Sequence, residues 1–321
     1  MRNNLPERLQ QIEFSSRLQR LGLGESRLAL GTAGLGGVWG PVDPAESVET
    51  ILLALSHGIN VLDTAAAYGT AEIVVGQALQ QWTGPRPVVS TKVGKLPSDS
   101  PSSDYDFSSE GMRFSLRRSL DRLQVGQVDL LLLHEPEMVP ADQRARVIDA
   151  LCELKNAGLT RHLGLGGGYG SGWDIFVESG AFSVVMIHSR FDACCLEAFQ
   201  SDIHRARTNG LAIYGASPLH NGLLGDRYDE FSTQAPSWLP RACLSAAGRV
   251  RRLADQYGLS LASLAHRFLY SAADVDRVVL GASRPSQLEA AVEDWRNGSL
   301  PEELFAAVCE TILVETPTGS G

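Results

Sequence analysis

From residue 27 onward the chain alternates short apolar runs with longer amphipathic segments, and this alternation constrains the fold more than any other feature. Eight runs rich in Val, Ile and Leu read as strands, each followed by a helical pattern. Strands that alternate with helices pair in parallel. Eight units in this length predict a closed (β/α)8 barrel, a TIM barrel, rather than a doubly wound sheet. The expected strands are Arg27–Leu30, Ile59–Leu62, Pro87–Thr91, Val128–Leu133, Arg161–Leu165, Ser183–Ile187, Leu211–Gly215 and Val278–Leu280.

Local signals set the helix boundaries and the domain organisation. Asp43-Pro44-Ala45-Glu46 places a capping acid, a proline and a glutamate where a helix begins. The adjacent Cys194 and Cys195 read as the start of a helix over Leu196–Thr208. Residues 96–109 form a polar loop long enough to fold over a site. We expect residues 1–25 to be an N-terminal arm or barrel cap, and residues 26–321 to be one barrel domain with a C-terminal helix.

Charge and cysteine content exclude several classes of protein. The 321 residues carry a formal net charge of −9, which disfavours nucleic acid or an anionic membrane as a partner. No early stretch resembles a signal peptide, and no apolar run reaches membrane-spanning length. The five cysteines are odd in number and lack CxxC or zinc spacing. A reduced, cytoplasmic setting is expected. The sequence makes no prediction of the oligomeric state.

Four reactive side chains follow three consecutive predicted strands. Asp63 follows the second strand and Tyr68 lies on its loop, Lys92 ends the third strand and His134 ends the fourth. In a (β/α)8 barrel the C-terminal strand ends meet at one face, which carries the active site. We therefore expect the four groups to lie within hydrogen-bonding reach of one another.

The chemistry of this tetrad is that of a tuned acid/base. A free tyrosine, with a pKa of about 10, is a poor proton donor or acceptor near neutrality. A lysine cation such as Lys92 stabilises the phenolate and moves the pKa of Tyr68 toward working pH. Asp63 would orient Lys92 and keep it charged, and His134 would orient a substrate oxygen or assist a proton relay.

Each member of the tetrad also has a simpler interpretation when it is taken alone. Lys92 and Asp63 could form a structural ion pair, His134 could be a satisfied histidine at the barrel edge, and Tyr68 could be a packing residue. Their joint placement on adjoining strand ends favours function. We expect no metal here, because His134 and Asp63 lack further histidines at ligand spacing.

These motifs closely resemble the aldo-keto reductase signature. The matching segments are Leu62-Asp63-Thr64-Ala65…Tyr68-Gly69…Glu72…Gly76, Ser90-Thr91-Lys92 and Leu132-Leu133-His134. The resemblance runs from the first strand to the last helix. It implies a (β/α)8 barrel that binds an extended nicotinamide dinucleotide without a Rossmann domain. It also implies Tyr68 as the general acid/base, Asp63 and Lys92 as its tuning pair, and His134 as the substrate-orienting residue.

A weaker similarity indicates a branch of the family. Asp106-Phe107-Ser108, the following Gly111 and Arg113, and His134-Glu135-Pro136-Glu137 look like the branch of aldose 1-dehydrogenases and L-galactose dehydrogenase. Those enzymes oxidise the hemiacetal carbon of a sugar to a lactone with NAD or NADP. The resemblance thus implies a small carbonyl or sugar substrate.

The resemblance assigns cofactor contacts to the ends of several strands. Glycines after the first strand let the backbone approach a ligand closely, although they do not form a GxGxxG fingerprint. The loop after strand seven resembles the family's, and the helix start after strand eight resembles its phosphate-binding loop. The residues implied are Gly31, Thr32, Asp63, Ser217, Pro218, Leu219, Gly281, Ser283, Arg284 and Gln287.

The chain also departs from the family pattern. Gly166-Gly167-Gly168 stands where many members hold the nicotinamide carboxamide with Ser-Asn, and Ala216 stands where many place a tyrosine. Gln287 replaces the usual arginine, and Ala290-Ala291 replaces Glu-Asn. The choice between NAD and NADP therefore stays open.

The prediction for function is an NAD(P)-dependent oxidoreductase that transfers a hydride between nicotinamide and an aldose or small hydroxy-aldehyde. One alternative is a broad aldehyde or ketone reductase, and another is a non-catalytic, cofactor-sensing regulatory subunit. A more distant alternative is a lyase or isomerase that uses Lys92 as a Schiff base.

Overall fold

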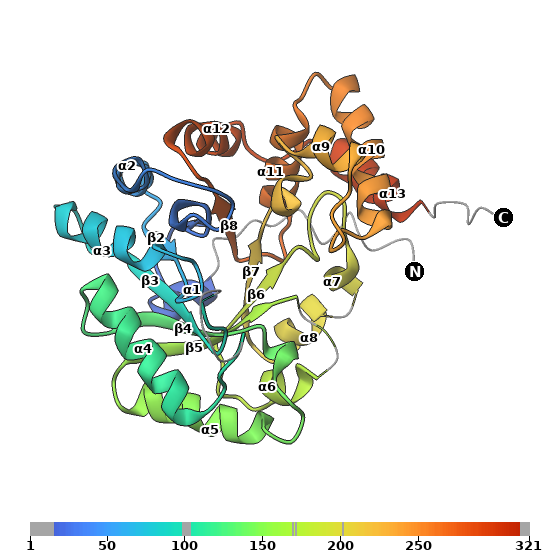
Figure 1. Cartoon of the computed structure of the whole chain (residues 1–321). Coiled ribbons are helices and arrows are strands. Elements are labelled where there is room, and N and C mark those ends of the chain that lie inside the picture. The colour runs from blue at the N-terminus through green and yellow to red at the C-terminus, as the bar shows by residue number, and fades with distance from the viewer. Residues whose placement is uncertain (1–15, 98–103, 169, 171, 201, 315–321) are drawn as a thin grey trace.

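The eight predicted strands form a closed, all-parallel barrel (Figure 1). The computed structural model describes residues 16–97, 104–168, 170, 172–200 and 202–314. Each strand pairs with its neighbours in chain order, and β8 closes the barrel against β1. The expected (β/α)8 fold is confirmed. The strands are β1 Leu28–Gly31, β2 Val61–Asp63, β3 Val88–Val93, β4 Val128–His134, β5 Thr160–Gly167, β6 Val184–His188, β7 Ala212–Ala216 and β8 Arg277–Gly281.

Helices surround the barrel as an outer layer (Figure 1). They are α2 Pro44–Ser56, α3 Ala71–Gln81, α4 Ser109–Leu123, α5 Arg144–Asn156, α6 Asp174–Glu178, α7 Glu197–Gln200, α8 Asp202–Thr208, α9 Tyr228–Thr233, α10 Arg241–Gln256, α11 Leu261–Ser271, α12 Pro285–Arg296 and α13 Glu302–Leu313. Short 3-10 turns are η2 Gly34–Gly36, η3 Pro136–Met138 and η4 His220–Gly222. Within the described part of the chain, no helix is long and apolar enough to cross a bilayer.

Two helix starts can be compared with the prediction. Asp43 caps α2 as expected, since its Oδ1 accepts a hydrogen bond of 2.9 Å from the backbone of Ala45. The helix expected over Leu196–Thr208 is instead divided into α7 and α8, and residue 201 lies outside the described residues. Cys194 and Cys195 are not a helix start. They lie in a tight turn, because the Asp192 carboxylate accepts from the Cys194 backbone and holds the chain away from helical geometry.

Apolar side chains fill both sides of the barrel wall. Along β4, Leu130 and Leu132 point into the barrel, whereas Leu131 and Leu133 pack against the outer helices. Every residue of β4 is buried, as expected for a parallel strand covered on both faces. The barrel is therefore a packed core, and open space for a ligand must lie at its ends.

The N-terminal end of the barrel is closed by α1, Ser16–Leu21 (Figure 1). Leu18 and Leu23 belong to the apolar cluster inside the barrel. Arg277 is fully buried at this end, and it donates to the carbonyl oxygens of Leu23 at 2.7 Å and Gly24 at 3.0 Å. Residues 16–25 thus cover one barrel end, and residues 1–15 of the predicted arm lie outside the described residues.

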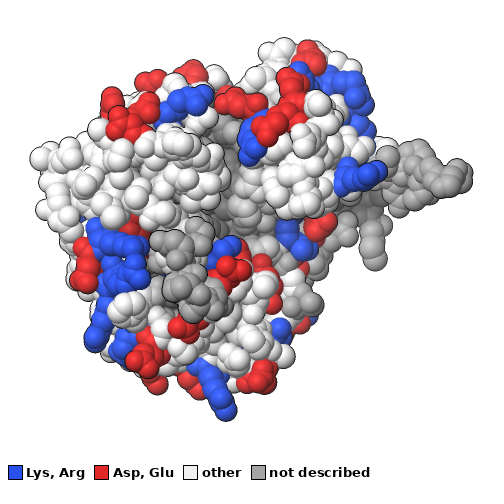
Figure 2. Space-filling view, viewed as in Figure 1, with Lys and Arg blue, Asp and Glu red and all other residues white. Residues whose placement is uncertain are grey.

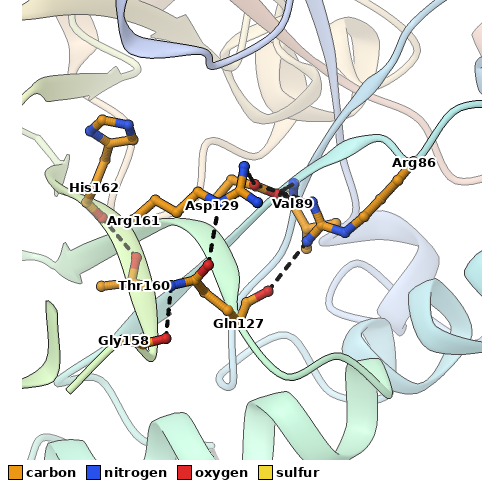
Figure 3. Close-up of polar contacts among 8 residues, drawn as sticks. All are labelled: Arg86, Val89, Gln127, Asp129, Gly158, Thr160, Arg161 and His162. Carbon is orange, nitrogen blue, oxygen red and sulfur yellow. Dashed lines mark hydrogen bonds and ion pairs between the residues drawn. The ribbon is translucent and has the colours of Figure 1, made fainter.

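Polar contacts also tie β3, β4 and β5 together at this end (Figure 3). The buried Asp129 carboxylate lies 2.8 Å from the Arg86 guanidinium and 3.3 Å from that of Arg161. It also accepts 2.9 Å from the backbone of Val89. These contacts anchor the N-terminal strand ends, so the opposite face is the one left for chemistry.

Candidate active site

The structure brings the four predicted side chains together at the C-terminal face. Asp63 is the last residue of β2, Lys92 is the penultimate residue of β3 and His134 is the last residue of β4. Neighbouring strands are in register there, with Asp63 opposite Ser90 and Lys92 opposite Leu132. Lys92 lies two residues beyond Ser90, and His134 lies two residues beyond Leu132, so the three side chains point to the same face of the sheet. Tyr68 reaches them from the loop between β2 and α3.

A buried ion pair forms the base of the tetrad. Lys92 Nζ lies 2.6 Å from Asp63 Oδ2 and donates 2.8 Å to the carbonyl oxygen of Thr64. The second carboxylate oxygen of Asp63 accepts 2.7 Å from the hydroxyl of Ser90. Lys92 Nζ also lies 4.7 Å from the centroid of the Tyr68 ring. Although burial acts to lower the pKa of Lys92, the Asp63 charge and Tyr68 outweigh it, so the pKa is raised and the lysine is charged.

Tyr68 differs from the expectation in one respect. Loss of solvent raises its pKa above 10, and the opposing effect of the Lys92 charge is smaller. The expected net lowering of the Tyr68 pKa is therefore not found in the protein alone, because desolvation of the phenolate outweighs its attraction to the ammonium. Tyr68 is a neutral phenol at neutral pH, with a cation placed to stabilise the phenolate when it forms.

His134 completes the site as a neutral imidazole. Burial, and secondarily the charge of Lys92, holds its pKa well below the ordinary value of 6.5. Its ring meets the Tyr68 ring edge to face, with 5.6 Å between the centroids. Nδ1 of His134 is buried and finds no hydrogen-bond partner among the described residues. An imidazole held neutral beside a phenol suits it to hydrogen-bond a substrate oxygen.

A second polar group lies beside His134 and was not predicted from the sequence. Lys95 Nζ is 2.6 Å from Glu135 Oε1, and the Tyr105 hydroxyl donates to the other oxygen of Glu135. Lys95, which precedes the 96–109 loop, also forms an isolated antiparallel bridge with Tyr105 within it. Residues 98–103, the middle of that loop, lie outside the described residues. Glu135 has a left-handed backbone, with φ of 55°, and the sequence contains no signal that predicts this conformation.

The end of β5 has no side chain toward the site. Gly166 pairs with His134 across β4 and β5, and the backbone of Gly168 donates 2.9 Å to Glu137. Glu137 also accepts 3.1 Å from the indole of Trp173, which is fully buried. The Glu137 carboxylate therefore occupies the space beside Gly167, and a Cβ added at Gly167 would come within 2.6 Å of it, where the family resemblance implied a Ser-Asn pair.

The predicted cofactor residues after β1 and β8 lie side by side. Gly31 ends β1 between Asp63 on β2 and Gly281 on β8. Thr32 is buried, and its hydroxyl donates 3.0 Å to the carbonyl of Asp63. The exposed Trp39 lies over this strip, because a Cβ added to Gly281 would come within 2.8 Å of its ring.

The loop after β7 reaches the start of α12. Ser217, Pro218 and Leu219 lead into η4, and Ser217 takes a left-handed φ of 63°. The backbone N–H of Ser283 donates 2.9 Å to Gln287 Oε1.

An acid that sequence reasoning missed, Asp226, joins these two segments. Its carboxylate lies 3.3 Å from Gln287 Nε2 and 3.6 Å from the Arg284 guanidinium. The predicted cofactor residues therefore form one continuous strip across β1, β7 and β8.

The groups along this strip fit a nicotinamide dinucleotide. The N-terminus of α12 and Arg284 supply the positive end that a phosphate requires. At the opposite end, His134 Nδ1 and Thr64 Oγ1 are buried without a partner in the described part of the chain. Gly31 and Gly281 lie between the two ends, and the Trp39 ring lies over Gly281.

A separate depression of about 380 Å³ lies between α2 and α12 on the outer layer. It contains none of the tetrad residues, so we do not connect it with the chemistry. The depression between α2 and α12 is lined by His57, Glu289, Ala290, Val292, Glu293 and Arg296.

Figure 2 shows the molecular surface hollowed near the centre of the view, between the α12 side and the side of α9 and α10.

Fold and site together define a (β/α)8 oxidoreductase with a tyrosine set against a buried lysine–aspartate pair and a neutral histidine. The chain belongs to the Aldo/keto reductase family, whose sequence profile matches residues 27–312. The resemblance stated from the motifs is confirmed, and so is the prediction of an oxidoreductase enzyme.

Named relatives share nearly the full length of the chain. L-galactose dehydrogenase of Arabidopsis thaliana is 31% identical over 326 residues, which cover 92% of this chain and 93% of that protein. D-threo-aldose 1-dehydrogenase of a Pseudomonas species is 28% identical, covering 92% of this chain and 97% of that protein. The solved structure of glycerol dehydrogenase from Gluconobacter oxydans superposes with a TM-score of 0.72 at 27% identity, covering 92% and 95% of the two chains.

Proposed function

We propose that this enzyme oxidises an aldose, or a similar small hydroxy-aldehyde, at its hemiacetal carbon with NAD or NADP in the cytoplasm. The observation that carries the proposal is the placement of Tyr68 between the Lys92 ammonium, 4.7 Å from its ring centroid, and the neutral His134. The names of two relatives, a galactose and an aldose dehydrogenase, favour a sugar. The free cysteines agree with a reducing compartment.

The tetrad supplies proton transfer and orientation. In reduction, the neutral Tyr68 phenol gives its proton to the carbonyl oxygen; in oxidation, Tyr68 first loses this proton to solvent and then, as the phenolate, takes the hydroxyl proton of the substrate. Lys92 stabilises the phenolate, and Asp63 holds the ammonium in place and charged. His134, which is neutral, hydrogen-bonds the same oxygen and sets its direction. The nicotinamide, when bound, accepts or supplies the hydride.

The cofactor would be held along the strip of strand ends. The glycine backbone after β1 and β8 allows close approach, and the start of α12 with Arg284 suits a phosphate. The Asp226 carboxylate lies 3.6 Å from Arg284, so it would repel the 2′-phosphate of NADP at this position. This repulsion favours NAD over NADP. The residues that we assign are Gly31, Thr32, Asp63, Ser217, Pro218, Leu219, Gly281, Ser283, Arg284 and Gln287.

The alternatives predict different behaviour. The Schiff-base mechanism needs a neutral Lys92, whereas the ion pair with Asp63 raises the pKa of the lysine. A broad reductase would reduce simple aromatic aldehydes faster than it oxidises sugars. A regulatory subunit would bind the cofactor without turnover.

One substrate screen separates these functions. The purified protein is incubated with a panel of aldoses and NAD or NADP, and with a panel of aromatic aldehydes and the reduced cofactors. Absorbance at the reduced nicotinamide band is followed in both directions. We expect the highest kcat/KM for an aldose with NAD. Preference for aromatic aldehydes would support the broad reductase, and stoichiometric cofactor binding without turnover on either panel would contradict an enzymatic role.

A further inference from the structure

Three metal-ligating side chains that do not belong to the tetrad converge on one point. Cys194 lies in the turn after β6, His220 lies in η4 after β7, and Cys243 lies in the first turn of α10. Their ligand atoms all lie within 4.8 Å of one another. Each side chain is at most 4% exposed. The cluster is therefore a buried meeting point of segments that are far apart in the sequence.

His220 is already oriented as a metal ligand would be. Its Nδ1 lies 2.7 Å from Oδ2 of Asp192, which is fully buried. A histidine that binds a metal through one ring nitrogen usually gives the other to a carboxylate, which fixes its tautomer and direction. Nε2 of His220 is thereby left for the cysteines.

A fourth donor stands next to the cluster. Cys195 is also buried, and its thiol contacts the thiol of Cys243. Three sulfurs and one imidazole nitrogen are a donor set typical of structural zinc. The Cys194 thiol presently donates 3.2 Å to Asp192. A bound cation would displace this proton, because coordination deprotonates a thiol outright.

We propose that Cys194, Cys195, His220 and Cys243 form a structural site for a soft divalent cation, with Zn²⁺ as the best match. The site is separate from the catalytic tetrad. Cys194, His220 and Cys243 have ligand atoms within 4.8 Å of one another, whereas Cys195 contacts Cys243 outside that group and would complete the shell by a side-chain movement. Four protein ligands would close the coordination shell, so the ion would hold structure rather than activate water. Sequence spacing did not reveal the site because its donors come from three separate segments.

The ion would fasten the loops after β6 and β7 to α10. The loop after β7 contains three non-glycine residues in the left-handed region, Ser217, His220 and Asn221, with φ of 63°, 47° and 55°. Such residues persist only where surrounding contacts hold them. Metal bonds at His220 would supply such a contact next to Ser217–Leu219.

A catalytic interpretation of the same cluster fits less well. In a thiol-dependent enzyme, Asp192 would orient His220, and His220 would act as the base that activates the Cys243 thiol. Cys243 is only 4% exposed, so a substrate could not reach its sulfur. A disulfide between Cys243 and Cys194 or Cys195 is the remaining competitor, and the test below distinguishes it.

The first measurement is metal content. The full chain is purified from zinc-supplemented medium, and zinc is measured by inductively coupled plasma mass spectrometry. We expect about one zinc per chain in the wild type, and at least a fivefold loss in Cys243→Ser and His220→Gln. Two matched controls should retain the metal: Cys309→Ser, another buried thiol, and His266→Gln, whose Nδ1 also lies 2.7 Å from an aspartate, Asp294.

A second measurement on the wild type does not depend on the variants folding. Cobalt is exchanged into the protein, and absorption is recorded for the sulfur-to-cobalt charge-transfer band and the intense d–d bands of a tetrahedral thiolate site. Both are expected. The proposal is overturned if stoichiometric zinc or cobalt does not bind, if zinc loss is equal in His266→Gln and His220→Gln, or if mass spectrometry finds a disulfide at Cys243.

Discussion

Lys92 Nζ lies 2.6 Å from Oδ2 of Asp63, and the two side chains are only 2% and 5% exposed. A buried ammonium is tolerated because this carboxylate, the Thr64 carbonyl and the Tyr68 ring surround it. The pair thus fixes a permanent positive charge next to the phenol, at the position where negative charge forms during proton transfer.

Removal of the carboxylate charge should therefore affect both stability and rate. In Asp63→Asn, Lys92 stays buried without a counter-charge, which should lower the free energy of unfolding by about 3–5 kcal/mol. The lysine would also lose its proton more readily, so turnover should fall by about 10²–10⁴-fold. Urea denaturation and steady-state kinetics measure the two effects.

Asp129→Asn is the matched control for this variant. Asp129 is equally buried but binds Arg86 and Arg161 at the N-terminal end of the barrel. The control should lose stability while kcat of the folded fraction stays within about twofold of the wild type. Equal losses of kcat in the two variants would show that the Asp63 effect is structural only.

The neutral state of His134 predicts a pH-dependent stability. Its pKa is held well below 6.5 in the folded protein, so below pH 6.5 the unfolded chain binds a proton that the native state does not. Stability should accordingly fall as pH decreases. Between pH 7.5 and pH 5 this group accounts for up to about 2 kcal/mol, which His134→Gln should remove. The free energy of unfolding is measured by denaturation at the two pH values, with the surface variant His57→Gln as control. An equal change of this free energy with pH in the wild type and in His134→Gln would contradict the prediction.

Cofactor choice should respond to the Asp226–Arg284 contact. Because the Asp226 carboxylate lies 3.6 Å from Arg284, Asp226→Asn should strengthen NADP binding by about tenfold, or 1.4 kcal/mol, with little change for NAD. Arg284→Ala should weaken NADP and leave NAD nearly unchanged. Fluorescence titration with both cofactors gives the ratios. An equal shift for both cofactors in either variant would place the 2′-phosphate elsewhere.

The closed N-terminal end of the barrel should matter for stability alone. Arg277→Met leaves the carbonyl oxygens of Leu23, Gly24 and Ser26 without their donor, which should cost about 3 kcal/mol or more. The tetrad lies at the opposite end, so kcat of the folded enzyme should be unchanged. Arg267→Met, which removes a donor to Gly298 and Ser299 on the outer layer, should cost less. A selective loss of kcat in Arg277→Met would contradict the separation of the two ends.

Much of this architecture follows from local sequence pattern. The run Val128–Leu133 predicted a strand covered on both faces because only Asp129 interrupts its apolar side chains, and β4 is buried throughout. Asp63, Lys92 and His134 could be placed on one face because parallel strands end together. The strand boundaries moved by only a few residues, as at β5, which continues through Gly166 and Gly167.

The remainder depends on contacts between distant segments. Asp226 meets Arg284, and Cys194 meets Cys243, only after the loops of β6 and β7 have folded against α10 and α12. The pKa of Tyr68 could not be predicted in sign, because desolvation and the Lys92 charge act in opposite directions and only geometry sets their balance. No periodic pattern in the sequence encodes such distances.

The phenol of Tyr68 is the group on which the proposed function rests, and Tyr68→Phe tests it most directly. The cofactor dissociation constant and the single-turnover rate of hydride transfer to or from the preferred aldose are measured on the same preparation. The variant should bind the cofactor within about twofold of wild type while hydride transfer falls by about 10²–10⁴-fold, since only the hydroxyl is removed. Hydride transfer within a few fold of the wild-type rate would contradict the assignment of Tyr68 as the proton donor and acceptor.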